Sequence, residues 1–121
     1  MGCIYTGMKN SRRVNGFFKV GMTQDSTPTK RWNAYDLMGL MYVYCPKATK
    51  TELLYLEAVA RLRAERIGMT LQGNDCFLYA IEQGNKSGQA IAIARAITEE
   101  VCQHCEKLGI EYEWKQTVFC R

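Results

Sequence analysis

The amino-acid sequence predicts an α/β sandwich of the α+β kind, with a small, mainly antiparallel sheet flanked by helices. Short runs of aromatic and β-branched residues open the chain, and two longer stretches further on carry apolar residues at helical spacing. The length of 121 residues suits one domain with one core. A composition of 47% hydrophobic and 23% charged residues excludes a disordered chain.

The chain is predicted to begin with a β-hairpin. Residues 3–8 form the first expected strand and residues 17–21 the second, because aromatic and β-branched residues favour strands. The basic, turn-rich stretch between them supplies the loop. Pro28 after Thr27 is a helix-start signal, so a helix is expected over residues 28–38.

A third strand is predicted over residues 40–45, closed by Pro46. The strongest helix signal follows it. Thr49 or Thr51 can cap this helix, apolar residues recur at helical spacing, and Gly68 ends it.

The last third of the chain is predicted to hold three elements around one turn. A short strand is expected around Phe77, and residues 85–88 have the composition of a turn. A long amphipathic helix over residues 89–108 ends at Gly109, and residues 110–119 alternate weakly, as in a strand. We expect residues 1–80 to form the core and residues 81–121 to pack on it within the same domain.

The long helix expected over residues 89–108 carries an apolar face that must be buried against another surface. This face is expected to pack on the sheet, and a helix that mediates dimer formation is the alternative. It comprises Ile91, Ile93, Ala94, Ile97, Val101, Cys105 and Leu108.

The six cysteines are scattered and mostly lie in apolar stretches, so they are expected to be reduced thiols in a cytoplasm. Cys102 and Cys105 flank His104, the one histidine, but a second ligand pair is missing, so two packed thiols are expected and no zinc site is assigned; a small zinc-binding interaction protein, with Cys76 or Cys120 as further ligands, is the alternative. No apolar run is long enough to span a bilayer, and the N-terminus lacks the pattern of a signal peptide.

The net charge of +4 conceals an asymmetry along the chain. Residues 1–66 hold eleven Lys and Arg against five Asp and Glu, whereas residues 67–121 hold five against seven. The basic side chains predict a surface that contacts a nucleic-acid backbone, with ordinary solvated charges as the alternative. The candidates are Lys9, Arg12, Arg13, Lys30 and Arg61.

A series of short motifs runs through the basic part of the chain. Cys3-Ile4-Tyr5 lies in the first expected strand, and the segment from Phe18 to Thr23 reads Phe-Lys-Val-Gly-Met-Thr. Arg31 and Tyr35 follow on the first helix, and Glu57 interrupts an otherwise apolar window of the next helix. The series resembles the GIY-YIG nuclease superfamily. It is most similar to the phage-type, meiotic-gene-like branch, in which Lys-(Ile/Val)-Gly-x-Thr replaces the second tripeptide.

The resemblance implies metal-dependent hydrolysis of DNA phosphodiester bonds by a small endonuclease. It implies that Tyr5 helps to activate water and that Glu57 holds one Mg²⁺ or Mn²⁺, hard cations that prefer oxygen ligands. Arg31 would offer paired donors to a phosphate. Lys19 would add positive charge, and Tyr35 lies one helical turn after Arg31 on the same face.

Two departures from the family pattern keep an alternative open. Cys3 stands where the family has its first glycine, and Lys19 stands where most members have a second tyrosine. The alternative is a non-catalytic module on the same fold that binds nucleic acid or protein, such as a phage-encoded interaction factor. A homodimer is also compatible with the sequence. The resemblance implies the cytoplasm of a bacterium or of a phage-infected host cell.

Overall fold

The computed structural model describes residues 1–9, 17–34, 37–68, 70–72, 76–78 and 86–117. Their elements follow one another as β1 (Gly2–Lys9), β2 (Phe17–Thr23), α1 (Thr29–Ala34), β3 (Leu37–Cys45), α2 (Lys50–Ile67), β4 (Thr70–Gln72), β5 (Cys76–Leu78), α3 (Lys86–Leu108) and β6 (Glu113–Gln116).

The strands of the described residues form one six-stranded sheet in the order β4-β5-β2-β1-β3-β6. Every adjacent pair is antiparallel. The predicted hairpin of β1 and β2 is confirmed, and β1 lies between β2 and β3 at the centre of the sheet. The predicted fold class, a small antiparallel sheet flanked by helices, is therefore confirmed.

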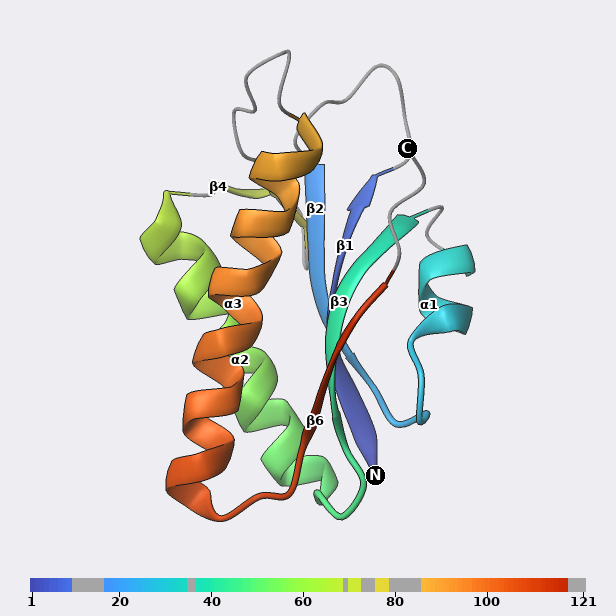
Figure 1. Ribbon diagram of the computed structural model, residues 1–121, viewed down its shortest axis with the longest axis vertical. Helices are drawn as coiled ribbons and strands as arrows, with labels where there is room; N and C mark the ends of the chain where they lie inside the picture. Colours follow the sequence, from blue (N-terminus) through green and yellow to red (C-terminus); the bar gives the residue numbers. More distant parts are fainter. Residues whose placement is uncertain (10–16, 35–36, 69, 73–75, 79–85, 118–121) are drawn as a thin grey trace.

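The helices form layers on both faces of the sheet (Figure 1). A Cβ atom built on Gly2 would lie 2.5 Å from Leu53 Cδ1, so this face of β1 is covered by α2. Tyr5 points to the opposite face, where its ring meets Trp32 of α1. Alternation along β1 thus separates a face covered by α2 and α3 from a face covered by α1.

The main core lies between the sheet and the pair α2 and α3. On the sheet it includes Ile4, Val20 and Val43, and on the two helices it includes Leu56 and Ile97. Within this layer α2 packs on β1 and β2, whereas α3 packs on β1 and β3. The apolar face of α3 therefore covers the sheet, as expected, except that Leu108 is exposed at the helix end.

Local signals fix the ends of α2 as the sequence predicts. Thr49 is the N-cap: its Oγ1 accepts a hydrogen bond from the Glu52 backbone N at 3.1 Å, and Glu52 Oε1 accepts one from the Thr49 backbone N at 2.8 Å. This reciprocal pair is a capping box. Gly68 ends the helix with a φ of 105°, a conformation that glycine adopts without steric cost.

Two sequence predictions about element boundaries are wrong, and one short strand was missed. The helix predicted over 28–38 ends at Ala34, because Leu37 already pairs with Lys9 in the sheet. The turn predicted over 85–88 is helical from Lys86 onward. β4 was not predicted, since its three residues carry no periodicity that distinguishes them from a loop.

The end of the chain joins the same sheet. β6 pairs with β3 from Glu113 to Gln116, so the strand predicted over 110–119 is shorter within the described residues. Ile110 instead turns into the core after α3. Residues 86–117 thus complete the sheet and the core that the first part of the chain begins.

Candidate functional site

Tyr5 lies at the centre of the α1 face of the sheet. A Cβ atom built on Gly21 would lie 2.5 Å from Tyr5 Oη and 2.6 Å from its Cζ, so the phenol lies directly over Gly21 of β2. The ring meets Trp32 edge-on, with centroids 6.5 Å apart. Only 2% of Tyr5 is exposed. Because Gly21 has no side chain, the Tyr5 ring fits over β2. A glycine of the segment from Phe18 to Thr23 therefore positions the tyrosine of Cys3-Ile4-Tyr5.

Lys19 lies on β2 two residues before Gly21, so its side chain points to the same face as Tyr5. It pairs with Gly7 in the register of β1 and β2. The residue is 6% exposed, which is unusual for lysine. The predicted Tyr5 and Lys19 are thus brought together on one face.

Trp32 is a member of this face that the sequence analysis missed. Its ring lies over Gly39, and it meets Tyr42 edge-on at a centroid distance of 5.9 Å. Its Nε1 is buried and has no hydrogen-bond partner among the described residues. Gly39, inside a strand, was the available signal, because a strand glycine often marks a close approach of another group.

The short helix α1 carries the cationic candidates of this face. Arg31 and Lys30 are exposed beside the buried Trp32, whose backbone N donates to the Pro28 carbonyl at 2.9 Å. Two cations therefore stand at the surface next to the aromatic group. Tyr35 and the loop residues Arg12 and Arg13 lie outside the described residues. Lys9 ends β1, and its side chain also lies outside them.

Glu57 and Arg61 lie on α2, in the layer that covers the opposite face of the sheet. Arg66 marks the side of α2 toward α3, because its Nη2 lies 3.2 Å from Oε1 of Glu100. Glu57 lies nine residues before Arg66, and at about 100° per residue the two side chains point about 180° apart around the helix axis. Glu57 therefore points away from α3. Since α2 packs on β1 and β2, this side of α2 lies toward β2 and its outer neighbours.

The predicted catalytic residues are therefore divided between two layers. Tyr5, Lys19 and the helix with Arg31 share the α1 face, and Glu57 is half-buried on the side of α2 that lies toward β2. β5 pairs with β2 only from Phe17 to Lys19, so in the described residues Gly21 lies on a part of β2 that has β1 as its one partner strand. The part of β2 around Gly21 therefore lies between Tyr5 and the α2 layer that carries Glu57.

The described residues contain no cluster of three or more His, Cys, Asp or Glu side chains that could hold a metal ion. Among the predicted site residues, Glu57 is the one carboxylate. The sole histidine is engaged elsewhere, because Tyr55 Oη and His104 Nδ1 lie 2.9 Å apart.

Cys45, Cys102 and Cys105 lie together near the end of α3, whereas Cys3 lies on β1 on the face of Tyr5, where its Sγ donates to the Asp25 and Ser26 carbonyls. Cys3, Cys45, Cys102 and Cys105 are free thiols. Cys105 donates a hydrogen bond to Cys45, which lowers the pKa of Cys45 and raises that of Cys105. Burial raises the pKa of Cys3 and of Cys102 to about 12. The thiols of Cys3, Cys102 and Cys105 therefore remain protonated at neutral pH.

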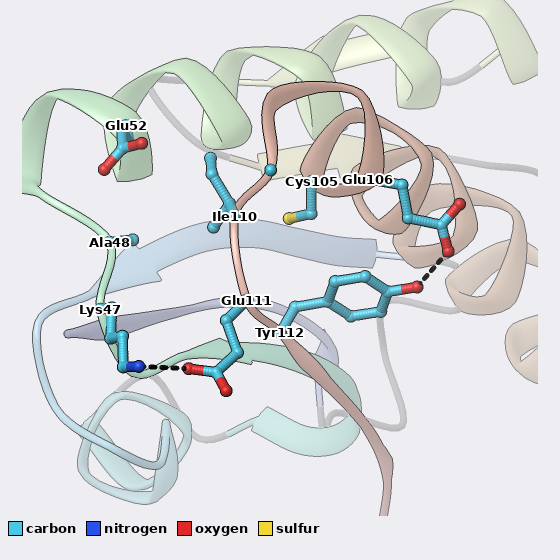
Figure 2. Close-up of a pocket in the computed structure, with 9 residues that line it drawn as sticks. Lys47, Ala48, Glu52, Cys105, Glu106, Ile110, Glu111 and Tyr112 are labelled. Atoms are coloured by element: carbon cyan, nitrogen blue, oxygen red, sulfur yellow. Dashed lines mark hydrogen bonds and ion pairs between the residues drawn. The ribbon is translucent and has the colours of Figure 1, made fainter.

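A cavity of about 560 Å³ opens next to Cys105, between the start of α2 and the end of α3 (Figure 2). Each charged side chain that lines it already has a partner, which for Glu52 is the Thr49 backbone N at 2.8 Å. Lys47 Nζ lies 3.5 Å from Glu111 Oε2, and Tyr112 Oη donates to Glu106 Oε1 at 2.6 Å. Because its charged side chains already have hydrogen-bond or ion-pair partners, this cavity is a weaker candidate than the α1 face.

No family model, no curated protein and no solved structure matches this chain. In the part of the chain that the structure describes, no helix combines the length and the apolar character needed to cross a membrane.

Proposed function

We propose that this protein hydrolyses phosphodiester bonds in DNA with one Mg²⁺ or Mn²⁺, as a small endonuclease of the GIY-YIG type. One observation carries the proposal: the Tyr5 phenol lies over Gly21 of the second motif, with Lys19 beside it on the same face. Two sequence motifs that are separate in the chain therefore lie on one face of the sheet, which supports the proposal.

The residues of this face have the chemistry that phosphodiester hydrolysis needs. Tyr5 would orient or deprotonate the attacking water, and Lys19 would help to neutralise the charge that develops on the phosphate. Arg31 and Lys30 are exposed on α1 and would contact backbone phosphates. Binding of DNA to this face would therefore weaken steeply as salt is added.

Glu57 would hold the metal ion. Its carboxylate oxygens suit a hard cation, and Mg²⁺ commonly keeps several waters while it binds one or two carboxylates and substrate phosphates. The ion would supply positive charge next to the scissile phosphate. Because Glu57 belongs to the α2 layer, the proposal requires the DNA strand to pass along the β2 edge, between the two layers.

A non-catalytic module that binds nucleic acid or protein is the second candidate. It is favoured by the burial of Tyr5 and Lys19, which are 2% and 6% exposed. Water and phosphate reach Tyr5 and Lys19 only if the side chains that bury these two residues move aside. Both candidates would act in the cytoplasm of a bacterium or a phage-infected cell.

Nicking of supercoiled plasmid distinguishes the two candidates. We expect cleavage with Mg²⁺ or Mn²⁺, and its loss in Glu57→Ala and in Tyr5→Phe. The matched control is Glu99→Ala, which removes an exposed carboxylate from α3 and should leave cleavage unchanged. Retained DNA binding with no cleavage under either metal would refute the nuclease and support the binding module.

A further inference from the structure

Two buried thiols meet where the end of β3 packs against the last turn of α3. Cys45 is the last residue of β3, and Cys105 lies three residues before the end of α3, sixty residues later in the chain. Both side chains are fully buried, and both thiols are free. Cys105 donates a hydrogen bond to Cys45, so the two thiols are in direct contact. Only the tertiary fold brings this pair together.

A cavity lies beside the pair. Cys105 and Ala48, the residue three positions after Cys45, both belong to the wall of the cavity of about 560 Å³ between the start of α2 and the end of α3 (Figure 2). In Figure 2 the Cys105 Sγ points toward Ile110, another residue of that wall. Water fits in a cavity of this volume, and hydrogen peroxide is only slightly larger than water. The cavity therefore offers a small oxidant a route to the two thiols, which small shifts of the wall side chains would complete.

We propose that Cys45 and Cys105 form a peroxide-sensitive pair, in which hydrogen peroxide from the cavity converts the two thiols to a disulfide between β3 and α3. The pair belongs to the core between the sheet and the helices α2 and α3, whereas Tyr5 meets Trp32 on the opposite face of the sheet. This modification site is therefore independent of the proposed nuclease function.

The hydrogen bond makes Cys45 the first thiol to react. It lowers the pKa of Cys45 and so raises the fraction of thiolate, the form of cysteine that attacks oxidants. The thiolate attacks one peroxide oxygen and the O–O bond breaks, so that Cys45 becomes a sulfenic acid. The other oxygen leaves as hydroxide, which takes up the proton that Cys45 released.

Cys105 completes the reaction. Once Cys45 is a sulfenic acid, Cys105 no longer donates to a thiolate, which was the largest cause of its raised pKa. The Cys105 sulfur attacks the sulfenic sulfur and the S–S bond forms. The S–O bond breaks, and the oxygen leaves as water with the Cys105 proton. Two thiols and one peroxide thus give one disulfide and two waters.

Cys102 is a third thiol that provides a matched control. It lies on α3 one helical turn before Cys105, and it is less buried than Cys45 and Cys105. The hydrogen bond to Cys45, however, comes from Cys105. We therefore expect the disulfide to form without Cys102.

Peptide mapping after treatment with hydrogen peroxide tests the proposal. The protein is unfolded in the presence of iodoacetamide, which blocks every remaining thiol and prevents exchange. We expect two fewer blocked cysteines in the oxidised protein than in the reduced protein. Trypsin should release residues 32–47 joined to residues 96–107, and dithiothreitol should separate them.

Two variants identify the linked cysteine of α3, because residues 96–107 contain both Cys102 and Cys105. The link should persist in Cys102→Ala and disappear in Cys105→Ala, and circular dichroism verifies that both variants are folded. Three results would overturn the proposal: an oxidised wild type without the linked peptide, a link that persists in Cys105→Ala, or a link that is lost in Cys102→Ala.

The disulfide should also shift the stability of the protein. A cross-link that closes a long loop restricts the unfolded chain, so peroxide should raise the midpoint of urea denaturation in the wild type. The midpoint should stay unchanged by peroxide in Cys45→Ala. If peroxide shifts the midpoint equally in both proteins, the shift comes from another group and the proposal is wrong.

Discussion

Replacement of Gly21 by alanine is expected to destabilise the protein through Tyr5. The backbone of Gly21 is extended within β2, so alanine is allowed there by its backbone conformation. The new Cβ atom, however, would lie 2.5 Å from Tyr5 Oη and 2.6 Å from Cζ. The cost therefore comes from one contact with one side chain.

The magnitude follows from how far the ring must move. Ordinary carbon contacts begin near 3.5 Å, so the phenol must withdraw by about 1 Å. Tyr5 is buried and its ring meets Trp32 edge-on, which limits this movement. Overpacking of this kind costs about 1–3 kcal/mol, and the lower entropy of the unfolded alanine chain offsets about 0.5 kcal/mol. We expect a net loss of about 0.5–2.5 kcal/mol.

Urea denaturation measures this loss as a lower midpoint with an unchanged slope. The same substitution in a Tyr5→Ala background is the control, because the ring is then absent and Gly21→Ala should be neutral or slightly stabilising. The difference between the two backgrounds is the coupling energy of the two positions. An equal cost in both backgrounds, or a stabilised single variant, would refute the placement of Tyr5 over Gly21.

Three further predictions concern the helix ends and the titrating groups. Thr49→Ala should lower the free energy of unfolding by about 1 kcal/mol, because it removes the hydrogen bond to the Glu52 backbone; urea denaturation measures the loss. The hydrogen bond to Glu106 raises the pKa of Tyr112 to about 12, so Glu106→Gln should move one tyrosine transition in the ultraviolet titration toward pH 10. Burial raises the pKa of Cys102 to about 12, so its contribution to stability is complete below about pH 9 and is lost as the pH rises toward 12. Cys102→Ala should flatten the decline of stability over that interval, and an unchanged decline would contradict the assignment.

Local sequence signals predicted the elements whose ends carry capping residues. Thr49, Glu52 and Gly68 determine the start and end of α2 through hydrogen bonds and backbone conformation within a few residues. The end of α1 could not be predicted in this way. Residues from Leu37 onward form β3 because β1 supplies a partner strand, and that contact joins positions far apart in the chain.

For the same reason, only part of the candidate site could be predicted from the sequence. The motif residues Tyr5 and Lys19 were identified from the sequence, and the register of β1 and β2 brings them to one face. Trp32 was missed, since its role depends on the space above Gly39 and on Tyr42, a residue of another strand. Whether Glu57 acts with Tyr5 stays a prediction.

The sequence by itself determined the fold class, the capped helix α2 and the hairpin, because periodicity, capping and turn residues act over short distances along the chain. Only the tertiary structure decided which side chains meet. It set Tyr5 over Gly21, assigned Glu57 to the opposite layer and left Leu54 and Leu62 exposed on α2. The physical reason is that strand register and layer packing choose the facing partner of each side chain, and a linear pattern of residues does not contain that choice.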